Sequence, residues 1–348
     1  MAVFRAPENP ILTPKDVVPS YDGFEVIGVF NAAAVRCRDE VLLLMRVAER
    51  PMQTDPNAVV AAFWDPAQSR IVTETFARSD PDNDFSDPRL IVRRNRTYLT
   101  SISHLRLARS ADGIHFTVDN RPALAPADPC ESFGIEDPRI TQIGPTYTIS
   151  YVAVSPLGVT TAMASTRDFV AFERHGVIFG PENKDVVLFP GPIDGRHYAL
   201  HRPHSPLCHR NDMWIAESPD LLCWGRHRHL MGTREGFWDE TRIGAGAPPV
   251  RTDAGWLEIY HAADRHNRYC LGAVLLDART PWKVLARSAE PLFEPQAEYE
   301  RTGFFGGVVF TCGLLCEHQT LKIYYGAADT TIAYAELPLD DVLTILSS

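Results

Sequence analysis

The stretch Asp137-Pro-Arg-Ile-Thr-Gln-Ile-Gly-Pro-Thr-Tyr-Thr-Ile-Ser-Tyr151 contains two short apolar, β-branched runs separated by Gly144-Pro145. Such runs predict two strands joined by a turn, which is a β-hairpin. The same order recurs at residues 87–101, 185–201, 247–260 and 307–325. Helical periodicity is nearly absent, and the one helix candidate is the tail at 339–346. The chain therefore predicts an all-β protein.

A turn that carries a hydroxyl and a carboxylate follows several hairpins. Its copies are Ala108-Arg-Ser-Ala-Asp112, Ala164-Ser-Thr-Arg-Asp168 and Ala216-Glu-Ser-Pro-Asp220, with Ser110, Ser165 and Ser218 lying 55 and 53 residues apart. A four-stranded unit that recurs at this spacing is typical of a β-propeller blade. A sandwich of two sheets is the alternative, but it gives no reason for the repeated turn. The number of blades, five or six, stays open. Residues 31–46 add a further hairpin to the count, and residues 47–98 can be an elaboration of one blade instead of an extra blade.

The charge and composition exclude several classes of protein. The chain has 348 residues and a formal net charge of −10, without a Lys/Arg-rich run, so neither nucleic acid nor a membrane is an expected partner. No apolar run approaches the roughly 20 residues of a membrane span, and the start lacks the apolar core of a secretory signal. The seven cysteines form no CxxC pair, so no zinc site or disulfide framework is indicated. We expect a cytoplasmic protein with one domain over 1–348, a lead-in at 1–25 and a short helical tail at about 339–348.

Polar residues occupy the beginnings of the predicted hairpins. In a propeller the innermost strand of every blade faces one axial funnel, so these residues are expected to converge there. They are Asn31, Asp87, Asp137, Lys184 and Arg242.

The segment Gly134-Ile-Glu-Asp-Pro-Arg139 places two carboxylates before a proline and a cation just after it. An Asp at a strand start that projects into a funnel can act as a general acid. The alternative is an Asp that caps a turn and pairs with the nearby Arg, and Asp87-Pro-Arg89 shows that the same three residues occur elsewhere. The residues alone leave the role of Asp137 open.

Cations form a second group of candidates. Lys184, Arg202, Arg242 and His261 all come from hairpin starts or ends. Cations that converge in an acidic protein make a specific anion site, with phosphate as the obvious guest. Gly244 and Gly246 would permit close backbone approach beside Arg242. Surface salt bridges are the alternative for each cation taken singly.

These residues resemble glycoside hydrolase family 130, the β-mannoside phosphorylases and their mannosidase relatives. The resemblance extends over nearly the whole chain. Its blocks include Glu8-Asn-Pro-Ile11, Gly134-Ile-Glu-Asp-Pro-Arg139, Pro181-Glu-Asn-Lys-Asp185, Leu200-His-Arg-Pro203, Arg242-Ile-Gly-Ala-Gly246, Arg268-Tyr-Cys-Leu-Gly272 and Tyr324-Tyr-Gly-Ala-Ala-Asp329. The pattern at residues 24–31 and 46–51 is most similar to the branch that acts on β-1,2-linked mannobiose and mannooligosaccharides.

The resemblance implies a five-bladed β-propeller with a central funnel and an inverting, reversible phosphorolysis. A β-mannoside and inorganic phosphate give α-mannose 1-phosphate, a glycosyltransferase-type reaction that needs no metal or organic cofactor. It implies that Asp137 is the general acid, which delivers its proton through the mannosyl 3-hydroxyl. The residues expected to bind the mannoside are Asn31, Arg46 and Asp329, together with Glu136 and Arg139 beside the acid. Those that match phosphate-binding positions are Lys184, Arg202, Arg242, His261 and Tyr269.

Two other functions stay open from the sequence. A β-1,2-mannosidase of the same family needs a second carboxylate to activate water, and Asp239 or Glu240 could supply it. A carbohydrate-binding propeller without catalysis would need neither Asp137 nor an anion site. The linkage (β-1,2 or β-1,4), the acceptor, the chain length and the oligomeric state are not determined by these residues, and a homo-oligomer is compatible with them.

Overall fold

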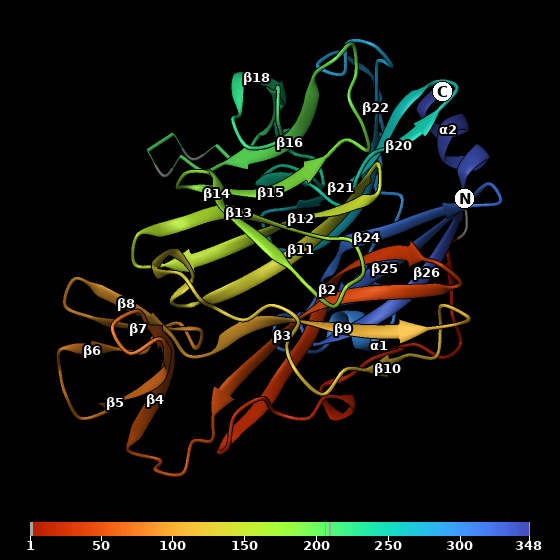
Figure 1. The fold of residues 1–348 in the computed structure, drawn as a ribbon. Coiled ribbons are helices and arrows are strands. Elements are labelled where there is room, and N and C mark those ends of the chain that lie inside the picture. The colour runs from red at the N-terminus through yellow and green to blue at the C-terminus, as the bar shows by residue number, and fades with distance from the viewer. Residues whose placement is uncertain (1–2, 206, 209, 348) are drawn as a thin grey trace.

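The predicted hairpin around Gly144-Pro145 is present as β11 (Gly134–Ile143) and β12 (Thr146–Ser155), which pair antiparallel. A computed structural model describes residues 3–205, 207–208 and 210–347. The chain is mostly β, so the all-β class is confirmed. Its antiparallel sheets follow one another around a common centre in chain order (Figure 1).

The largest sheet has eight strands. Within this sheet, the adjacent strands β9 and β11 are joined by a single parallel bridge, where Gly134 lies opposite Ser103. The other strands of this sheet are β2 (Phe24–Cys37), β3 (Glu40–Pro51), β9 (Ile102–Ser110), β10 (Thr117–Val118), β13 (Gly158–Thr166) and β14 (Glu173–Phe179).

Three further sheets follow the largest one around the same centre, and this succession of sheets is called the ring below. The first contains β15 (Asn183–Leu188), β16 (His197–Pro203), β17 (Met213–Ser218) and β18 (Gly225–Met231). The second contains β19 (Arg242–Ala245), β20 (Val250–Thr252), β21 (Gly255–Ala263), β22 (Tyr269–Leu276) and β23 (Val284–Arg287). The third contains β24 (Val309–Glu317), β25 (Thr320–Ala327), β26 (Thr331–Pro338) and β1 (Phe4–Arg5).

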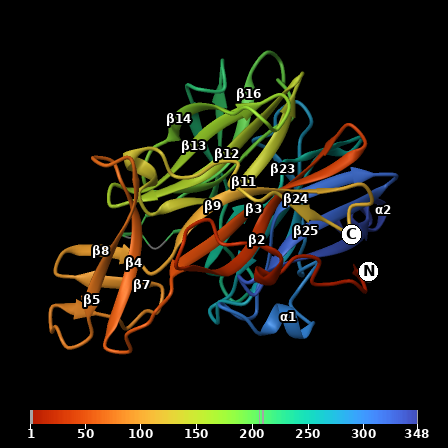
Figure 2. The ribbon, with the colours of Figure 1, turned by 60° about the horizontal axis from the view of Figure 1, so that its bottom comes forward.

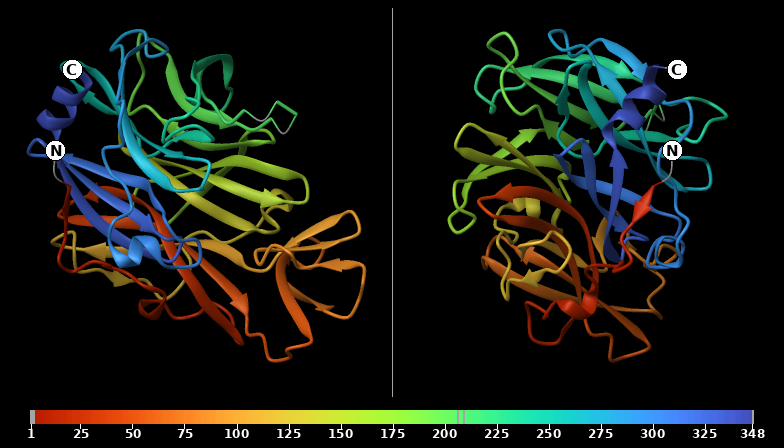
Figure 3. Two further views of the ribbon diagram at one scale, coloured as in Figure 1. Left: turned by 180° about the vertical axis from the view of Figure 1, so that it is seen from behind. Right: turned by 90° about the vertical axis from the view of Figure 1, so that its right-hand side faces the viewer.

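The N-terminal lead-in is part of the last sheet. Strand β1 pairs with β26 from the other end of the chain, and Arg5 Nε donates to Glu300 Oε1 at 2.8 Å. The helix α2 (Leu339–Ser347) forms the expected tail and lies on the same side of the molecule as β1 (Figure 3); residue 348 lies outside the described part. The remaining helices are short: η1 (Pro14–Asp16), η2 (Pro129–Glu131) and α1 (Glu298–Arg301).

An excursion of the chain between β3 and β9 forms two small sheets of its own. They contain β4 (Ala58–Asp65), β5 (Arg70–Ala77), β6 (Asn83–Asp84), β7 (Leu90–Arg93) and β8 (Arg96–Leu99). These strands project from the ring of larger sheets (Figure 2). The hairpin predicted at 87–101 therefore belongs to an elaboration rather than to a unit equivalent to the others.

Hydrophobic clusters fill each interface between neighbouring parts of the ring. Val187 and Ile243 belong to one cluster that joins the β15 and β19 sheets, and Ile259 and Ile323 belong to another that joins the β19 and β24 sheets. Similar clusters join β3 to β12, β13 to β15, and β2 to β26. Burial of these faces brings the inner strands together at the centre.

The repeated turn caps its own backbone. Ser110 Oγ accepts from Gly113 N at 2.8 Å, and Asp112 Oδ1 accepts from Ile114 N at 2.9 Å. Ser218 and Asp220 make the same pattern. In the middle copy the hydroxyl comes from Thr166, so the predicted equivalence of Ser165 is wrong by one residue. The hydroxyl must stand two residues before the Asp to reach the turn amides, and Ser165 instead contacts His175.

Among the residues that the structure describes, no helix is long and apolar enough to cross a bilayer.

The contact between β9 and β11 predicts a glycine requirement at residue 134. Gly134 has φ +117°, and a Cβ there would lie 2.6 Å from Ser103 N. Gly134→Ala should therefore lower the free energy of unfolding by about 2–4 kcal/mol, from left-handed strain and overpacking. Urea denaturation measures the loss. Gly144→Ala is the control, because Gly144 has φ +60° but nothing within 4 Å, and an equal loss in both variants would contradict the steric argument.

Candidate active site

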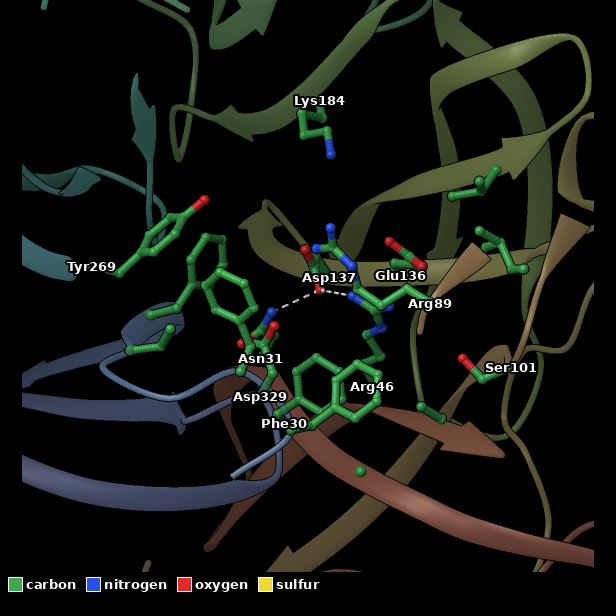
Figure 4. A pocket seen from close by; sticks show the side chains of 18 of the residues that line it. Phe30, Asn31, Arg46, Arg89, Ser101, Glu136, Asp137, Lys184, Tyr269 and Asp329 are labelled. Carbon is green, nitrogen blue, oxygen red and sulfur yellow. Dashed lines mark hydrogen bonds and ion pairs between the residues drawn. The ribbon is translucent and has the colours of Figure 1, made fainter. Parts of the chain in front are cut away.

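A central cavity of about 380 Å³ lies where the inner strands meet. It brings together residues far apart in sequence (Figure 4). The predicted site residues that line it are Asn31, Arg46, Glu136, Asp137, Lys184, Arg202, Arg242, Tyr269 and Asp329. Of the residues expected at hairpin starts, only Asp87 is not among the lining residues; its carboxylate is paired with Arg89 instead.

One backbone device repeats at three inner strands. Asn31, Asp137 and Asp185 have φ values of 49°, 47° and 55°, in the left-handed region. Each lies at a register shift in the pairing of its strand with the next, as expected for a β-bulge. Asn and Asp tolerate this conformation better than other non-glycine residues. The bulge turns these side chains out of the strand alternation and toward the centre.

The carboxylate of Asp137 lies at one end of the cavity. Its Oδ1 accepts from Asn31 Nδ2 at 2.9 Å and from Arg46 Nη1 at 3.2 Å. Arg46 Nη2 also donates to Glu136 Oε1 at 2.6 Å, and its guanidinium lies 4.7 Å from the centre of the Phe30 ring. Arg46 therefore orients both carboxylates of the Glu-Asp pair, and Asn31 and Arg46, both expected to bind the mannoside, lie beside Asp137.

Burial sets the ionisation of the other carboxylates at this end. Burial raises the pKa of Asp329 to about 6, against the opposing effect of Arg46, and the negative charges of Asp137 and Glu136 add to the rise. Burial also raises the pKa of Glu136, although Arg46 lowers it. With a pKa of about 6, the Asp329 carboxyl is therefore partly protonated in mildly acidic solution.

The opposite part of the cavity is cationic. Lys184, Arg202 and Arg242 all line it, and Arg242 Nη1 donates to the Tyr269 hydroxyl at 3.0 Å. Lys184 points into the space, and it makes no ion pair with any residue that the structure describes (Figure 4). Converging cations that keep free donors can bind a dianion through charge-assisted hydrogen bonds.

Asp185 lies beneath this cationic end. Its Oδ2 accepts from Arg202 Nε at 2.7 Å and contacts His261 Nε2 at 3.1 Å, while its Oδ1 accepts from Arg139 Nη2 at 3.2 Å. Burial alone would raise the pKa of Asp185, but these three partners hold it well below its usual range. Gly244 lies against Asp185 and His261 so closely that no side chain would fit, which confirms the predicted role of this glycine.

Two predicted contacts differ in the structure. Arg139, expected to bind substrate, is 1% exposed and is not among the lining residues, because carbonyls and Asp185 take up its guanidinium. His261, expected to bind phosphate, is also 1% exposed and lies behind Arg202 on Asp185. Burial lowers the pKa of His261, partly opposed by Asp185. Both residues support the cavity rather than line it.

The candidate bases of a hydrolase lie elsewhere. Asp239 is fully buried and is bonded to Arg234, Arg287 and the Tyr260 hydroxyl. Glu240 pairs with Arg265 at 2.8 Å. Neither Asp239 nor Glu240 lines the cavity.

Several residues that line the cavity were not predicted from the sequence. Arg89 enters the cavity from the excursion, paired with Asp87 at 2.7 Å and 5.7 Å from the centre of the Phe305 ring. The sequence feature that could have indicated Arg89 is the Asp87-Pro-Arg89 triplet. Its Asp pairs with its Arg, as the alternative reading proposed for Asp137 and Arg139. Nothing in the local pattern indicated that Phe305 or Asp185 would face the centre.

The chain is similar to several known proteins in sequence and in fold. Residues 85–348 match the model of glycoside hydrolase family 130, described as beta-1,4-mannooligosaccharide phosphorylase. The beta-1,2-mannobiose phosphorylase of Listeria innocua serovar 6a is 48% identical over 347 residues, 99% of this chain and 98% of that protein. The 1,2-beta-oligomannan phosphorylase of Thermoanaerobacter sp. is 39% identical over 244 residues, 69% of this chain and 80% of that protein. A solved structure of beta-1,2-mannobiose phosphorylase from Listeria innocua with beta-1,2-mannobiose has a TM-score of 0.97, at 47% identity over 100% of this chain and 99% of that chain.

The ion cluster predicts a large stability effect at Asp185. Asp185→Ala leaves two buried guanidinium groups without their counter-charge, so the free energy of unfolding should fall by about 3–5 kcal/mol. Asp194→Ala is the control, because it removes an exposed ion pair with Arg279 and, like Asp185→Ala, places alanine at a left-handed φ (48° against 55°); it should cost about 1–2 kcal/mol. Urea denaturation of both variants measures the difference, and equal losses would show that Asp185 is not the counter-charge of the cluster.

Proposed function

The chain belongs to glycoside hydrolase family 130, and we propose that it is an inverting β-mannoside phosphorylase. A β-mannoside and inorganic phosphate would give α-mannose 1-phosphate and the shortened acceptor, reversibly. The observation that carries the proposal is the division of one cavity into a carboxylate end at Asp137 and a cationic end at Lys184, Arg202 and Arg242. Phosphate is itself a nucleophile, so such a site needs one acid and a cation cluster.

We assign the roles as follows from the geometry. Asp137 donates the proton to the leaving glycosidic oxygen, by way of the mannosyl 3-hydroxyl in the manner expected for the family. Phosphate, held at the cationic end, attacks the anomeric carbon as the bond to the leaving oxygen breaks. The mannosyl unit would be held by the hydrogen-bonding groups near Asp137, which are Asn31, Arg46, Glu136 and Asp329. At the phosphate end, Tyr269 lies beside Arg242 and would contribute its hydroxyl.

Hydrolysis is the second candidate, and nothing in the cavity favours it. An inverting hydrolase needs a carboxylate to activate water on the face opposite the acid. Asp239 and Glu240, the bases considered from the sequence, are both engaged in ion pairs away from the cavity. The cations that a phosphorylase requires are all retained.

The β-1,2 linkage is proposed for the substrate. It is supported by the relatives named for β-1,2-mannobiose and 1,2-beta-oligomannan, the first of which is similar over nearly the entire chain. β-1,2-Mannobiose or short β-1,2-mannooligosaccharides are therefore the substrates to test first. A cytoplasmic location and a homo-oligomer stay predictions from the sequence.

We also propose that the fold is a five-bladed β-propeller forming one catalytic domain over 1–348. If the eight-stranded sheet is divided at the single bridge between β9 and β11, the ring consists of five units built on β2, β11, β15, β19 and β24. The hydrophobic clusters between successive units, including the one that joins β2 to β26, support a closed ring. Strand β1 would close the last blade.

Product analysis tests the reaction. β-1,2-Mannobiose is incubated with the protein with and without inorganic phosphate; mannose 1-phosphate and mannose should form only with phosphate. Two mannose molecules in either condition would indicate a mannosidase.

Asp137→Asn should keep its fold and lose about 100-fold or more of turnover, because the amide cannot donate the proton. Asp194→Asn, on the exposed surface, serves as the matched control and should turn over normally.

The raised pKa of Asp329 predicts a pH dependence of sugar binding. A carboxyl group with a pKa of about 6 is ionised above that pH and protonated below it. Ionised Asp329 can accept two sugar hydroxyls, so affinity for β-1,2-mannobiose should fall as the pH drops below about 6. Calorimetry in the absence of phosphate measures the affinity for the disaccharide at pH values from roughly 1.5 units below to roughly 2 units above the pKa of Asp329. Asp329→Asn should flatten this acid limb, and an unchanged limb in the variant would assign it to another group.

A further inference from the structure

Arg139 is a charged side chain buried at the centre of the ring. It is 1% exposed, and its guanidinium lies 5.8 Å from the centre of the Phe310 ring. A buried guanidinium is costly unless its N–H groups are hydrogen-bonded and its charge is balanced. The positions of its partners therefore indicate what this residue holds in place.

The bonds of Arg139 join three parts of the ring. Nη1 donates to the carbonyl of Asp137 at 3.0 Å, within its own strand β11. Nη2 donates to Asp185 Oδ1 at 3.2 Å, on β15, and to the carbonyl of Ala245 at 3.1 Å, on β19. Nε donates to the carbonyl of Gly246 at 3.1 Å. The fork of the guanidinium thus fixes the separation of three strands that all contribute to the cavity.

Both ends of the cavity are attached to this side chain. At one end, the bond to the Asp137 carbonyl restrains the residue whose backbone has φ 47°, a conformation that needs support from its surroundings. At the other end, Asp185 accepts from Arg139 through Oδ1 and from Arg202 through Oδ2. A chain of hydrogen bonds through two side chains, Arg139 and Asp185, therefore links the backbone of Asp137 to the guanidinium of Arg202.

We propose that Arg139 is a positioning residue that sets the acid and the phosphate-binding cations at a fixed distance from one another. This inference rests on the proposed phosphorolysis. Inverting displacement needs the proton donor and the nucleophile aligned across one anomeric carbon, and a misplacement of about 1 Å can cost about 100-fold in rate. Arg139 acts through Asp137 and Arg202, without contact to either substrate.

Arg139→Lys tests the proposal because it retains the charge and loses the fork. An ammonium group cannot hold the Asp137 carbonyl, Asp185 and two further carbonyls in this planar geometry. We expect kcat to fall by about 30-fold or more and KM for phosphate to rise by about 5-fold, while KM for the mannoside changes by less than about 3-fold. Calorimetric binding of inorganic phosphate alone should weaken by the same factor as KM.

The control is Arg106→Lys, at a second fully buried arginine. Arg106 donates to the carbonyl of Val18 and lies near Glu49, and neither it nor these partners line the cavity. It should lose thermal stability as Arg139→Lys does and keep all kinetic constants within about 2-fold. Equal kinetic effects in the two variants would reduce Arg139 to a purely structural role.

Further outcomes separate this inference from the proposed function. If the wild-type protein cleaves mannosides without phosphate, the phosphorylase assignment fails. If wild-type cleavage depends on phosphate but Arg139→Lys keeps both kcat and phosphate affinity, the positioning role is overturned. Should Arg139→Lys not fold, Asp185→Asn replaces it, since the amide weakens the same link at its other end. A change confined to mannoside KM in that variant would also overturn the proposal.

Discussion

The buried carboxylate of Asp185 is the interaction on which the rest of the cavity depends. It balances Arg139 and Arg202 and contacts His261, which come from β11, β16 and β21. Without this anion, two guanidinium groups would lie in the interior with an uncompensated charge, at a cost of several kcal/mol per ion. The cationic end of the cavity is thus built on a negative charge beneath it. That anion also joins the cations to the strand that carries Asp137.

The inner strands place their functional groups through one backbone conformation. Asn31, Asp137 and Asp185 each adopt a left-handed conformation at a bulge. Only Asn, Asp and Gly adopt it readily, so the demand of the backbone and the demand of the chemistry select the same residue types. The acid, its amide neighbour and the counter-ion of the cations consequently occupy equivalent positions on three inner strands, β2, β11 and β15. The repetition of the fold is therefore also a repetition of the site.

The excursion between β3 and β9 adds a different kind of residue to the cavity. Arg89 from the turn before β7, Leu90 of β7 and Leu99 of β8 reach the wall of the cavity from outside the ring. The inner strands thus carry the acid and the cations, while the inserted excursion contributes part of the wall. Division of labour between scaffold and loops is common in enzymes, because loops can change without disturbing the packed core.

The sequence by itself determined the all-β class, the hairpins, the helical tail and most of the polar and charged residues that line the cavity, because strand patterns and residue chemistry are local. It did not determine that the 87–101 hairpin belongs to an excursion, nor that Arg139 and His261 support the cavity from behind. Arg139, Arg202 and His261 are all basic residues near hairpin ends and look alike in the sequence. Only the tertiary structure distinguishes them, because each one's exposure depends on which strands pack beside it. Their common partner, Asp185, lies 46 residues from Arg139 and 76 from His261, a convergence that no local pattern encodes.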